Sequence, residues 1–132
     1  MAQKLSEQFK TADWKNEKHV PVIECSDTVE KGQLFNVKVT VGKEVAHPNT
    51  TAHHIRWIKL LVKEEGSKAL VEIANMEFNA HGASADGADT SGIYTNHEAI
   101  ISMKMEKSGT LYAMSYCNIH GLWESMREIK VD

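Results

Sequence analysis

The sequence predicts an all-β protein, a sandwich or barrel built from about seven short strands. Apolar and polar side chains alternate with a period of two over residues 35–41, 101–106 and 128–132. This period is typical of strands that bury one face. Glycines separate the apolar segments at intervals that suit turns between strands. The length of 132 residues fits a single domain spanning residues 1–132.

Each expected strand is marked either by strict alternation or by a short, nearly continuous apolar run bounded by turn residues. Only residues 1–13, ahead of these segments, are suited to a short helix. The expected strands cover residues 20–23, 35–41, 55–62, 69–78, 101–106, 111–116 and 129–131.

Two segments are expected to be loops. Residues 47–53 are mostly polar, and Pro48 restricts His47 to an extended backbone. Residues 81–97 are rich in glycine and small side chains, which predicts a long surface loop. Both loops connect expected strands, so they lie where functional side chains are often found.

Composition and charge exclude several function classes. Hydrophobic residues make up 42% and charged residues 25% of the chain, the balance of a globular domain. The formal net charge of -3 provides no general attraction for nucleic acid or for an anionic membrane surface. The chain shows no apolar segment long enough for a membrane span and no signal-peptide core. We therefore expect a cytoplasmic protein whose Cys25 and Cys117 are free or metal-bound.

Histidine and cysteine residues gather at three places, each at or beside the end of an expected strand. His19 precedes the first strand, and His47 and His53 bracket the polar loop. Cys117 and His120 form the motif C-N-I-H. Imidazole binds Fe, Zn, Cu and Ni, and a single thiolate adds a soft, electron-donating ligand. Four imidazoles and one thiolate would hold a metal ion and leave a sixth position open to a small substrate.

Other interpretations of these residues are open at this point. An isolated C-x-x-H pair is a weak signal, and histidines at strand ends are usually hydrogen-bonded surface residues. A blue-copper electron carrier would use two histidines, Cys117 and a weak axial methionine such as Met126. A β domain that only mediates interactions is a third possibility. An immunoglobulin-type disulfide between Cys25 and Cys117 is disfavoured, because Trp57 is too far from Cys25 for that pattern.

Three longer motifs resemble those of a known family. E-K-H-V-P-V-I-E (17–24), V-G-K-E-V-A-H-P-N-T-T-A-H-H-I-R-W-I (41–58) and S-Y-C-N-I-H-G-L-W-E (115–124) are similar to the one-iron superoxide reductases, the neelaredoxin type of the desulfoferrodoxin family. N-A-H-G (79–82) and Tyr94-Thr95 add weaker matches. The resemblance implies an immunoglobulin-like β-sandwich of about seven antiparallel strands.

The resemblance also implies a function. Proteins of this type reduce superoxide to hydrogen peroxide at a mononuclear Fe(II) centre, with electrons from rubredoxin or a similar carrier, and form homotetramers. Lys18 is expected to attract superoxide, and Glu17 to occupy the sixth iron position in the ferric state. No cysteine precedes Cys25, so we expect no additional four-cysteine iron module. The implied iron ligands are His19, His47, His53 and His120 in the equatorial plane and Cys117 on the axis.

The remaining histidines have structural interpretations. His54 should point away from the site if His53 points into it, because neighbouring strand residues face opposite sides of a sheet. We expect neither His81 nor His97 to be a ligand. Packing roles are expected for Cys25 as a small buried hydrophobe, and for Leu122 and Trp123 as a shield of the thiolate against water.

Overall fold

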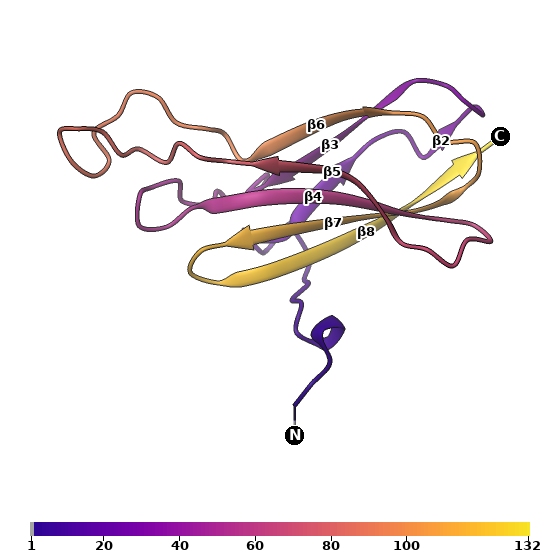
Figure 1. Ribbon diagram of the computed structural model, residues 1–132, viewed down its shortest axis with the longest axis horizontal. Coiled ribbons are helices and arrows are strands. Elements are labelled where there is room, and N and C mark those ends of the chain that lie inside the picture. The colour runs from indigo at the N-terminus through magenta and orange to yellow at the C-terminus, as the bar shows by residue number, and fades with distance from the viewer. Residues whose placement is uncertain (1) are drawn as a thin grey trace.

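Two β-sheets packed face to face form most of the structure, a computed structural model that describes residues 2–132 (Figure 1). The strands are β1 (Pro21–Glu24), β2 (Thr28–Val29), β3 (Phe35–Val41), β4 (Ile55–Glu64), β5 (Val71–Glu77), β6 (Glu98–Met103), β7 (Gly109–Cys117) and β8 (Gly121–Val131). One sheet has the order β1-β3-β6, and the other has the order β2-β8-β7-β4-β5. Among the described residues, no helix has both the length and the apolar character needed to cross a membrane.

The all-β sandwich predicted from the sequence is confirmed, with differences at three strands. The two-residue strand β2 was not expected, and it pairs with β8 in parallel, whereas all other strand pairs are antiparallel. Strand β6 begins at Glu98, ahead of the expected residues 101–106. Strand β8 begins at Gly121, although only residues 129–131 were expected to be strand.

The early part of β8 was missed because its half-buried face is polar. Ser125 Oγ donates a hydrogen bond to the carbonyl of Pro21 at 2.5 Å, and Arg127 Nη1 donates to the carbonyl of Ile23 at 3.0 Å. These side chains therefore satisfy the backbone of β1 instead of filling the apolar core. A strand of this kind has no alternation of apolar and polar residues for a sequence to show.

The N-terminal segment, the one part of the chain suited to a short helix, forms a very short one; Met1 lies outside the described residues. A single 3-10 turn, η1 (Leu5–Glu7), is formed, and none of its residues is buried. Further along, Lys10 attaches the segment to β8. Its N–H donates to the carbonyl of Leu122 at 3.2 Å, and its carbonyl accepts from the N–H of Glu124 at 2.9 Å. The segment therefore runs beside the beginning of β8.

The core lies between the sheets and contains the apolar face of each long strand. In β3, Val37, Val39 and Val41 are all 0% exposed, while the residues between them are more accessible. Leu60 of β4 and Leu111 of β7 are also fully buried. Burial of such side chains contributes about 1.5–3 kcal/mol each. Because a shift of one residue would turn this face to solvent, the core also fixes the strand register.

Several connections meet at one end of the sandwich (Figure 1). They are the β3–β4 loop (residues 42–54), the β5–β6 loop (residues 78–97) and the β7–β8 turn (residues 118–120). The expected long loop at residues 81–97 thus exists and is mostly exposed. The C-terminus lies at the opposite end.

Candidate metal centre

Three imidazole nitrogens and one sulfur converge at the β7–β8 turn. His19 Nε2 lies 3.1 Å from His120 Nδ1, and His53 Nε2 lies 3.2 Å from the same atom. Cys117 Sγ is 3.2 Å from His53 Nε2 and 3.8 Å from His120 Nδ1. All four donor atoms lie within 4.8 Å of one another. We refer to His19, His53, Cys117 and His120 as the donor cluster.

The β7–β8 turn places two of these donors. Cys117 ends β7 and pairs across the turn with Gly121, the first residue of β8. Gly121 has a φ of 85°, a conformation that glycine adopts without steric cost, and the chain reverses there directly after His120. The N–H of His120 points to Cys117 Sγ at 3.4 Å. The C-x-x-H spacing therefore brings sulfur and imidazole side by side.

His19 reaches the cluster from the segment before β1. Its carbonyl accepts a hydrogen bond from the buried hydroxyl of Ser115 at 3.0 Å. Its ring stacks on Trp123, with 5.0 Å between centroids and 14° between planes. Glu17 Oε1 lies 2.6 Å from His19 Nδ1 and also accepts from the His19 N–H at 3.0 Å. Because Nδ1 donates to this carboxylate, Nε2 directs a lone pair into the cluster.

The β3–β4 loop carries His47 and His53. A Cβ at Gly42, where φ is 80°, would lie 2.7 Å from the backbone nitrogen of His47, so a side chain at this position would displace the loop. His47 Nδ1 donates to the carbonyl of Pro48 at 2.6 Å, which leaves a lone pair on Nε2. The His47 ring lies 4.9 Å from that of His19 and 4.8 Å from that of His53. Its Nε2 is buried without a hydrogen-bond partner among the described residues.

This donor set fits a transition-metal ion. Two ligands at right angles, each ~2.1 Å from an ion, lie roughly 3 Å apart. The closest donor pairs of the cluster have this spacing. Lone pairs held so close repel each other unless a proton or a cation lies between them. Nε2 of His47 is not among the four converging donor atoms, although its ring packs against those of His19 and His53. A set of imidazoles with one thiolate suits iron, copper or zinc.

Burial favours the neutral form of the imidazoles. The pKa of His47 is lowered from 6.5 to about 4, mainly by burial and in smaller part by the neighbouring histidines. Burial is also the main cause that lowers the pKa values of His19 and His53, and the charge of His120 adds to it. Neutral imidazoles keep the lone pairs that bind a metal. The site is therefore ready to accept a cation at neutral pH.

Glu17 and Lys18 lie beside the donor cluster and are not members of it. The Glu17 carboxylate orients His19 through Nδ1, and its oxygens are not among the converging donors. Burial alone would raise the pKa of Glu17, but its hydrogen bonds with His19 outweigh burial and lower it. After burial, the charge of half-buried Lys18 is among the causes that lower the pKa values of His19 and His53. The positive charge of Lys18 therefore lies close enough to disfavour protonation of both imidazole rings.

His54, His81 and His97 lie outside the donor cluster. His54 turns away from the direction of His53 and stacks on His81, with 3.6 Å between centroids and 7° between planes. His97 packs against the edge of the His47 ring, 5.7 Å between centroids. Nε2 of His54 and Nδ1 of His97 are also buried without a partner among the described residues. A buried, unpartnered nitrogen alone therefore does not identify a metal ligand.

Cys25 and Met126 have no part in the cluster. Cys25 follows β1, at the opposite end of this strand from His19, and it is half-buried rather than fully buried as expected. Burial raises the pKa of its thiol, which keeps the sulfur protonated. Met126 is 67% exposed and pairs with Tyr112, far along β8 from the turn. It cannot act as the axial ligand that a blue-copper centre would need.

Sequence reasoning missed contacts that hold the ligands. Beyond its expected role as a shield of the sulfur, Trp123 stacks on His19 and donates from Nε1 to the carbonyl of His120 at 3.3 Å. Ser115 had no expected role, although a polar residue on the buried face of an apolar strand is a usable signal. Asn118 joins two loops, since its Oδ1 accepts from the N–H of His54 at 2.9 Å and its Nδ2 donates to the β3–β4 loop.

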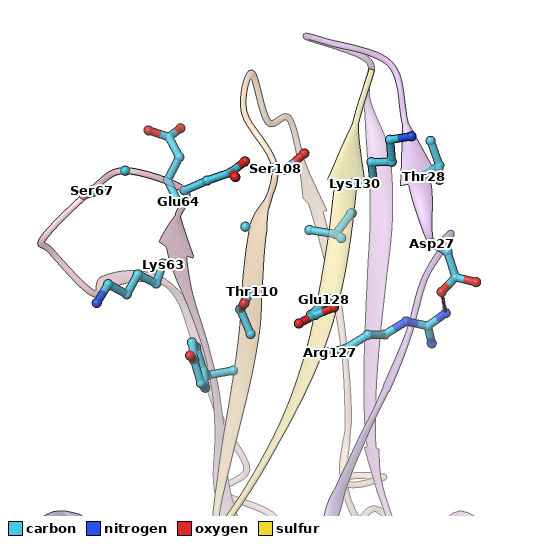
Figure 2. Close-up of a pocket in the computed structure, with 15 residues that line it drawn as sticks. Asp27, Thr28, Lys63, Glu64, Ser67, Ser108, Thr110, Arg127, Glu128 and Lys130 are labelled. Carbon is cyan, nitrogen blue, oxygen red and sulfur yellow. Dashed lines mark hydrogen bonds and ion pairs between the residues drawn. The ribbon is translucent and has the colours of Figure 1, made fainter.

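A pocket lies at the opposite end of the sandwich, and Figure 2 shows the side chains that line it. It has a volume of about 890 Å³ and is bordered by side chains of both charges, including Lys63, Glu64 and Lys130. Asp27 and Arg127, on its rim, already form an ion pair of 2.8 Å. Within the part of the chain that the structure describes, the donor cluster is the only group of potential metal ligands that converges. The candidate metal centre therefore lies at the end of the sandwich that carries the β7–β8 turn, and not at this pocket.

The chain is similar to members of one family in both sequence and fold. Its sequence matches the desulfoferrodoxin family over residues 11–126. Neelaredoxin from Megalodesulfovibrio gigas is 52% identical over 126 residues, which cover 96% of this chain and 97% of that protein. Superoxide reductase from Pyrococcus furiosus is 52% identical over 121 residues, 92% of this chain and 95% of that protein. The reduced superoxide reductase (neelaredoxin) structure from Archaeoglobus fulgidus superimposes with a TM-score of 0.87 at 56% identity, over 92% of this chain and 98% of that one.

Proposed function

The chain belongs to the desulfoferrodoxin family, and we propose that it is a superoxide reductase, an oxidoreductase that converts superoxide to hydrogen peroxide. The observation that carries this proposal is the convergence of three imidazoles and one thiolate at a single point. Relatives that share about half of its residues are named superoxide reductase or neelaredoxin. The reaction consumes one superoxide, one electron and two protons for each hydrogen peroxide released.

We assign the site to one iron ion. The buried, unpartnered Nε2 of His47 supports a fifth ligand beside the donor cluster, because its ring contacts two members of the cluster. When bound, the iron supplies the electron and a position that a small anion can occupy. The proposed ligands are His19, His47, His53, His120 and Cys117.

The surrounding residues have distinct proposed roles. Glu17 holds the Nδ1 proton of His19 and so fixes the direction of its Nε2, a contact that typically strengthens a metal ligand. We also propose Glu17 for the sixth position in the ferric state, which requires its carboxylate to leave His19. Lys18 provides local positive charge in a chain of net charge -3, and this charge attracts superoxide. Trp123 covers one face of His19.

The reaction type is tested by supplying superoxide to the iron-loaded protein with and without a reductant. We expect superoxide loss beyond a single turnover only when the reductant is present, with one hydrogen peroxide formed per superoxide. The Cys117→Ser variant, treated in the same way, is the matched control and should be nearly inactive. Superoxide loss that needs no reductant and releases stoichiometric oxygen would instead identify a dismutase.

The partners of the protein are part of the proposal. We propose rubredoxin or a similar small carrier as the electron donor in the cytoplasm, to be checked by following oxidation of reduced rubredoxin in the presence of superoxide. We also propose a homotetramer. The edge strand β5 exposes Val71, Ile73 and Met76, an apolar edge that packing between copies would cover. Analytical ultracentrifugation at micromolar concentration tests this, and monomer alone would contradict it.

A further inference from the structure

The β5–β6 loop is much longer than a connection between two strands requires. Irregular loops beyond about 12–15 residues are uncommon in small domains and often functional. Residues 78–97 extend at the same end of the sandwich as the β3–β4 loop, which carries His47 and His53 (Figure 1). We propose that the β5–β6 loop clamps the β3–β4 loop and positions these two histidines, with Asp89 as the main positioning residue. This inference rests on the metal site proposed for the protein.

The first contact of the clamp is made by the carboxylate of Asp89. Its Oδ1 accepts a hydrogen bond from the N–H of Thr51 at 2.9 Å and another from Thr51 Oγ1 at 3.3 Å. Thr51 lies inside the turn that ends at His53. That turn is closed by Thr50, whose Oγ1 accepts from the N–H of His53 at 3.0 Å and whose N–H donates to the His53 carbonyl at 2.9 Å. Fixing Thr51 therefore fixes the approach to His53.

The second contact acts on the other half of the loop. Asn49, two positions after His47, donates from Nδ2 to the carbonyl of Thr95 at 2.6 Å. Thr95 is itself held, because its N–H and hydroxyl donate to the carbonyl of Ala80 at 2.9 and 3.0 Å. Hydrogen bonds within the β5–β6 loop thus hold Thr95, the residue that accepts from Asn49. The stacked rings of His54 and His81 add an aromatic contact between the same two loops.

The backbone around Asp89 is unusual in a way that serves this contact. Asp89 has a φ of 58° and is the only non-glycine residue with positive φ among residues 2–132. Residues in this region persist where their surroundings hold them, and such positions often mark functional sites. Gly82 lies against it, because a Cβ there would approach both Asp89 Cα and Asp89 Oδ1 to 3.3 Å. The positive φ of Asp89 and the absence of a side chain at Gly82 therefore together fix the position of the Asp89 carboxylate.

Three variants separate the carboxylate from the backbone. Asp89→Gly removes both hydrogen bonds but suits the positive φ, so it does not strain the loop. Asp89→Asn keeps an accepting oxygen and also tolerates this conformation. Asp86→Gly is the matched control, since Asp86 is an exposed acid of the same loop whose carboxylate makes no hydrogen bond with the described residues.

The first measurement is hydrogen exchange on the metal-free proteins, which reports the clamp without any metal. We expect the backbone amides of residues 49–54 to exchange several-fold faster in Asp89→Gly than in the wild type. Exchange in Asp89→Asn and in Asp86→Gly should stay close to the wild-type rate. Equal protection of residues 49–54 in wild type and Asp89→Gly would overturn the proposal.

The second measurement is the release of bound metal to a chelator, from iron-loaded protein and from cobalt-loaded protein. We expect Asp89→Gly to release metal ~10-fold faster, the size of effect that residues supporting metal ligands typically have. Its cobalt ligand-field bands should shift while the sulfur charge-transfer band remains, because Cys117 is untouched. Asp89→Asn should restore release and spectrum.

The outcomes also distinguish this inference from the proposed function. Faster exchange in Asp89→Gly with unchanged metal release and spectrum would overturn positioning, because the loop would be held without affecting the ligands. The same loss of metal in Asp86→Gly as in Asp89→Gly would overturn it too. If the wild type takes up neither metal, the proposed function fails, and the exchange rates alone then decide whether the clamp exists.

Discussion

The two ends of the sandwich gather polar side chains from several strands and satisfy them in opposite ways. At the end that holds the C-terminus, Asp27 and Arg127 form an ion pair of 2.8 Å on the rim of the pocket (Figure 2). At the other end, the imidazoles of the donor cluster turn lone pairs toward one another, and His47 Nε2 has no partner among the described residues. The ion pair satisfies these two charges, whereas lone pairs held this close repel each other unless a proton or a cation lies between them. The convergence of donor atoms therefore distinguishes the end that holds the candidate metal centre.

The two cysteines repeat this contrast within one residue type. Cys117 is 0% exposed and lies among imidazole nitrogens, with the N–H of His120 directed at its sulfur. Cys25 is half-buried beyond β1, and burial raises the pKa of its thiol. Only Cys117 therefore has donor atoms around it that could share a metal ion. The predicted effects of substitution therefore differ most between these two positions.

The largest expected effect is that of Cys117→Ser. Serine is similar in size, so the fold should persist, but its hydroxyl is far less acidic and a much poorer soft donor. We expect loss of most activity and of any sulfur-to-iron charge-transfer colour in the oxidised protein. Absorption spectra and superoxide reduction assays measure both. Cys25→Ser is the control and should keep colour and activity. If Cys25→Ser lost colour and activity while Cys117→Ser kept both, the metal would be bound by Cys25 and the proposed ligand set would be wrong.

The next effect sharpens the distinction between buried histidines. His47 and His97 both have a buried ring nitrogen without a partner, but only His47 packs against two members of the donor cluster. We expect His47→Ala to weaken iron retention against a chelator by ~100-fold, at the upper end of effects near metal sites. His97→Ala should retain iron nearly as well as the wild type. Metal analysis after dialysis against the chelator decides, and equal losses would remove His47 from the ligand set.

A third prediction concerns the metal-free protein in acid. The pKa of His47 is about 4 in the folded state and 6.5 in the reference state, so the unfolded chain binds more protons between these values. The stability that comes from neutral His47 is complete above pH 6.5 and is lost as the pH falls to about 4. The loss amounts to about 3 kcal/mol. Urea unfolding of the metal-free protein at pH 7.5 and pH 4.5 measures it, with buffers chosen ~3 units apart to span the transition.

The matched variant for this experiment is His47→Leu, which removes the titrating group and keeps a buried side chain. Its free energy of unfolding should depend less on pH than that of the wild type. The same slope in both proteins would show that other groups cause the acid sensitivity. Charged pairs at the far end, such as Asp27 with Arg127, are present in both proteins and cancel in the comparison.

The smallest expected effect separates two lysines at opposite ends. If Lys18 attracts superoxide, Lys18→Ala should slow the second-order capture of superoxide by ~10-fold and weaken its salt dependence. Screening acts over about 10 Å at roughly 0.1 M salt, so a distant charge contributes little. Lys130→Ala, the same change at the far end, should leave capture unchanged. Pulse radiolysis at several ionic strengths measures the rates, and identical salt slopes for wild type and Lys18→Ala would leave Lys18 without a steering role.

The sequence allowed the fold to be predicted where burial imposes a period on the chain. The alternation that buries Val37, Val39 and Val41 is visible in the sequence, and so is the strand. This alternation is absent from the early part of β8, because Ser125 and Arg127 there contact the backbone of β1 and not apolar side chains. Strand β2 is too short, at two residues, to show any period.

The candidate site was predicted in part for a similar reason. The C-x-x-H pair and the two histidines of the β3–β4 loop are local motifs that a sequence displays directly. The stacking of Trp123 on His19 and the hydrogen bond from Ser115 to His19 join segments far apart in the chain. No local pattern records such contacts, because they depend on how the two sheets pack. The same holds for Asp89, whose partner Thr51 lies in another loop.

The separation of the donors along the chain has a consequence for the order of events in the cell. His19 and His120 are 101 positions apart, and His53 and Cys117 are 64 apart. Before β7 and β8 pair, an iron ion meets only fragments of the site. Of these residues only Cys117 belongs to the apolar core, and the rest of the core is built from other side chains. The scaffold can therefore be completed before a metal is bound. If the metal is the iron that we propose, its scarcity would leave a store of folded, inactive protein that a later supply could activate without new synthesis.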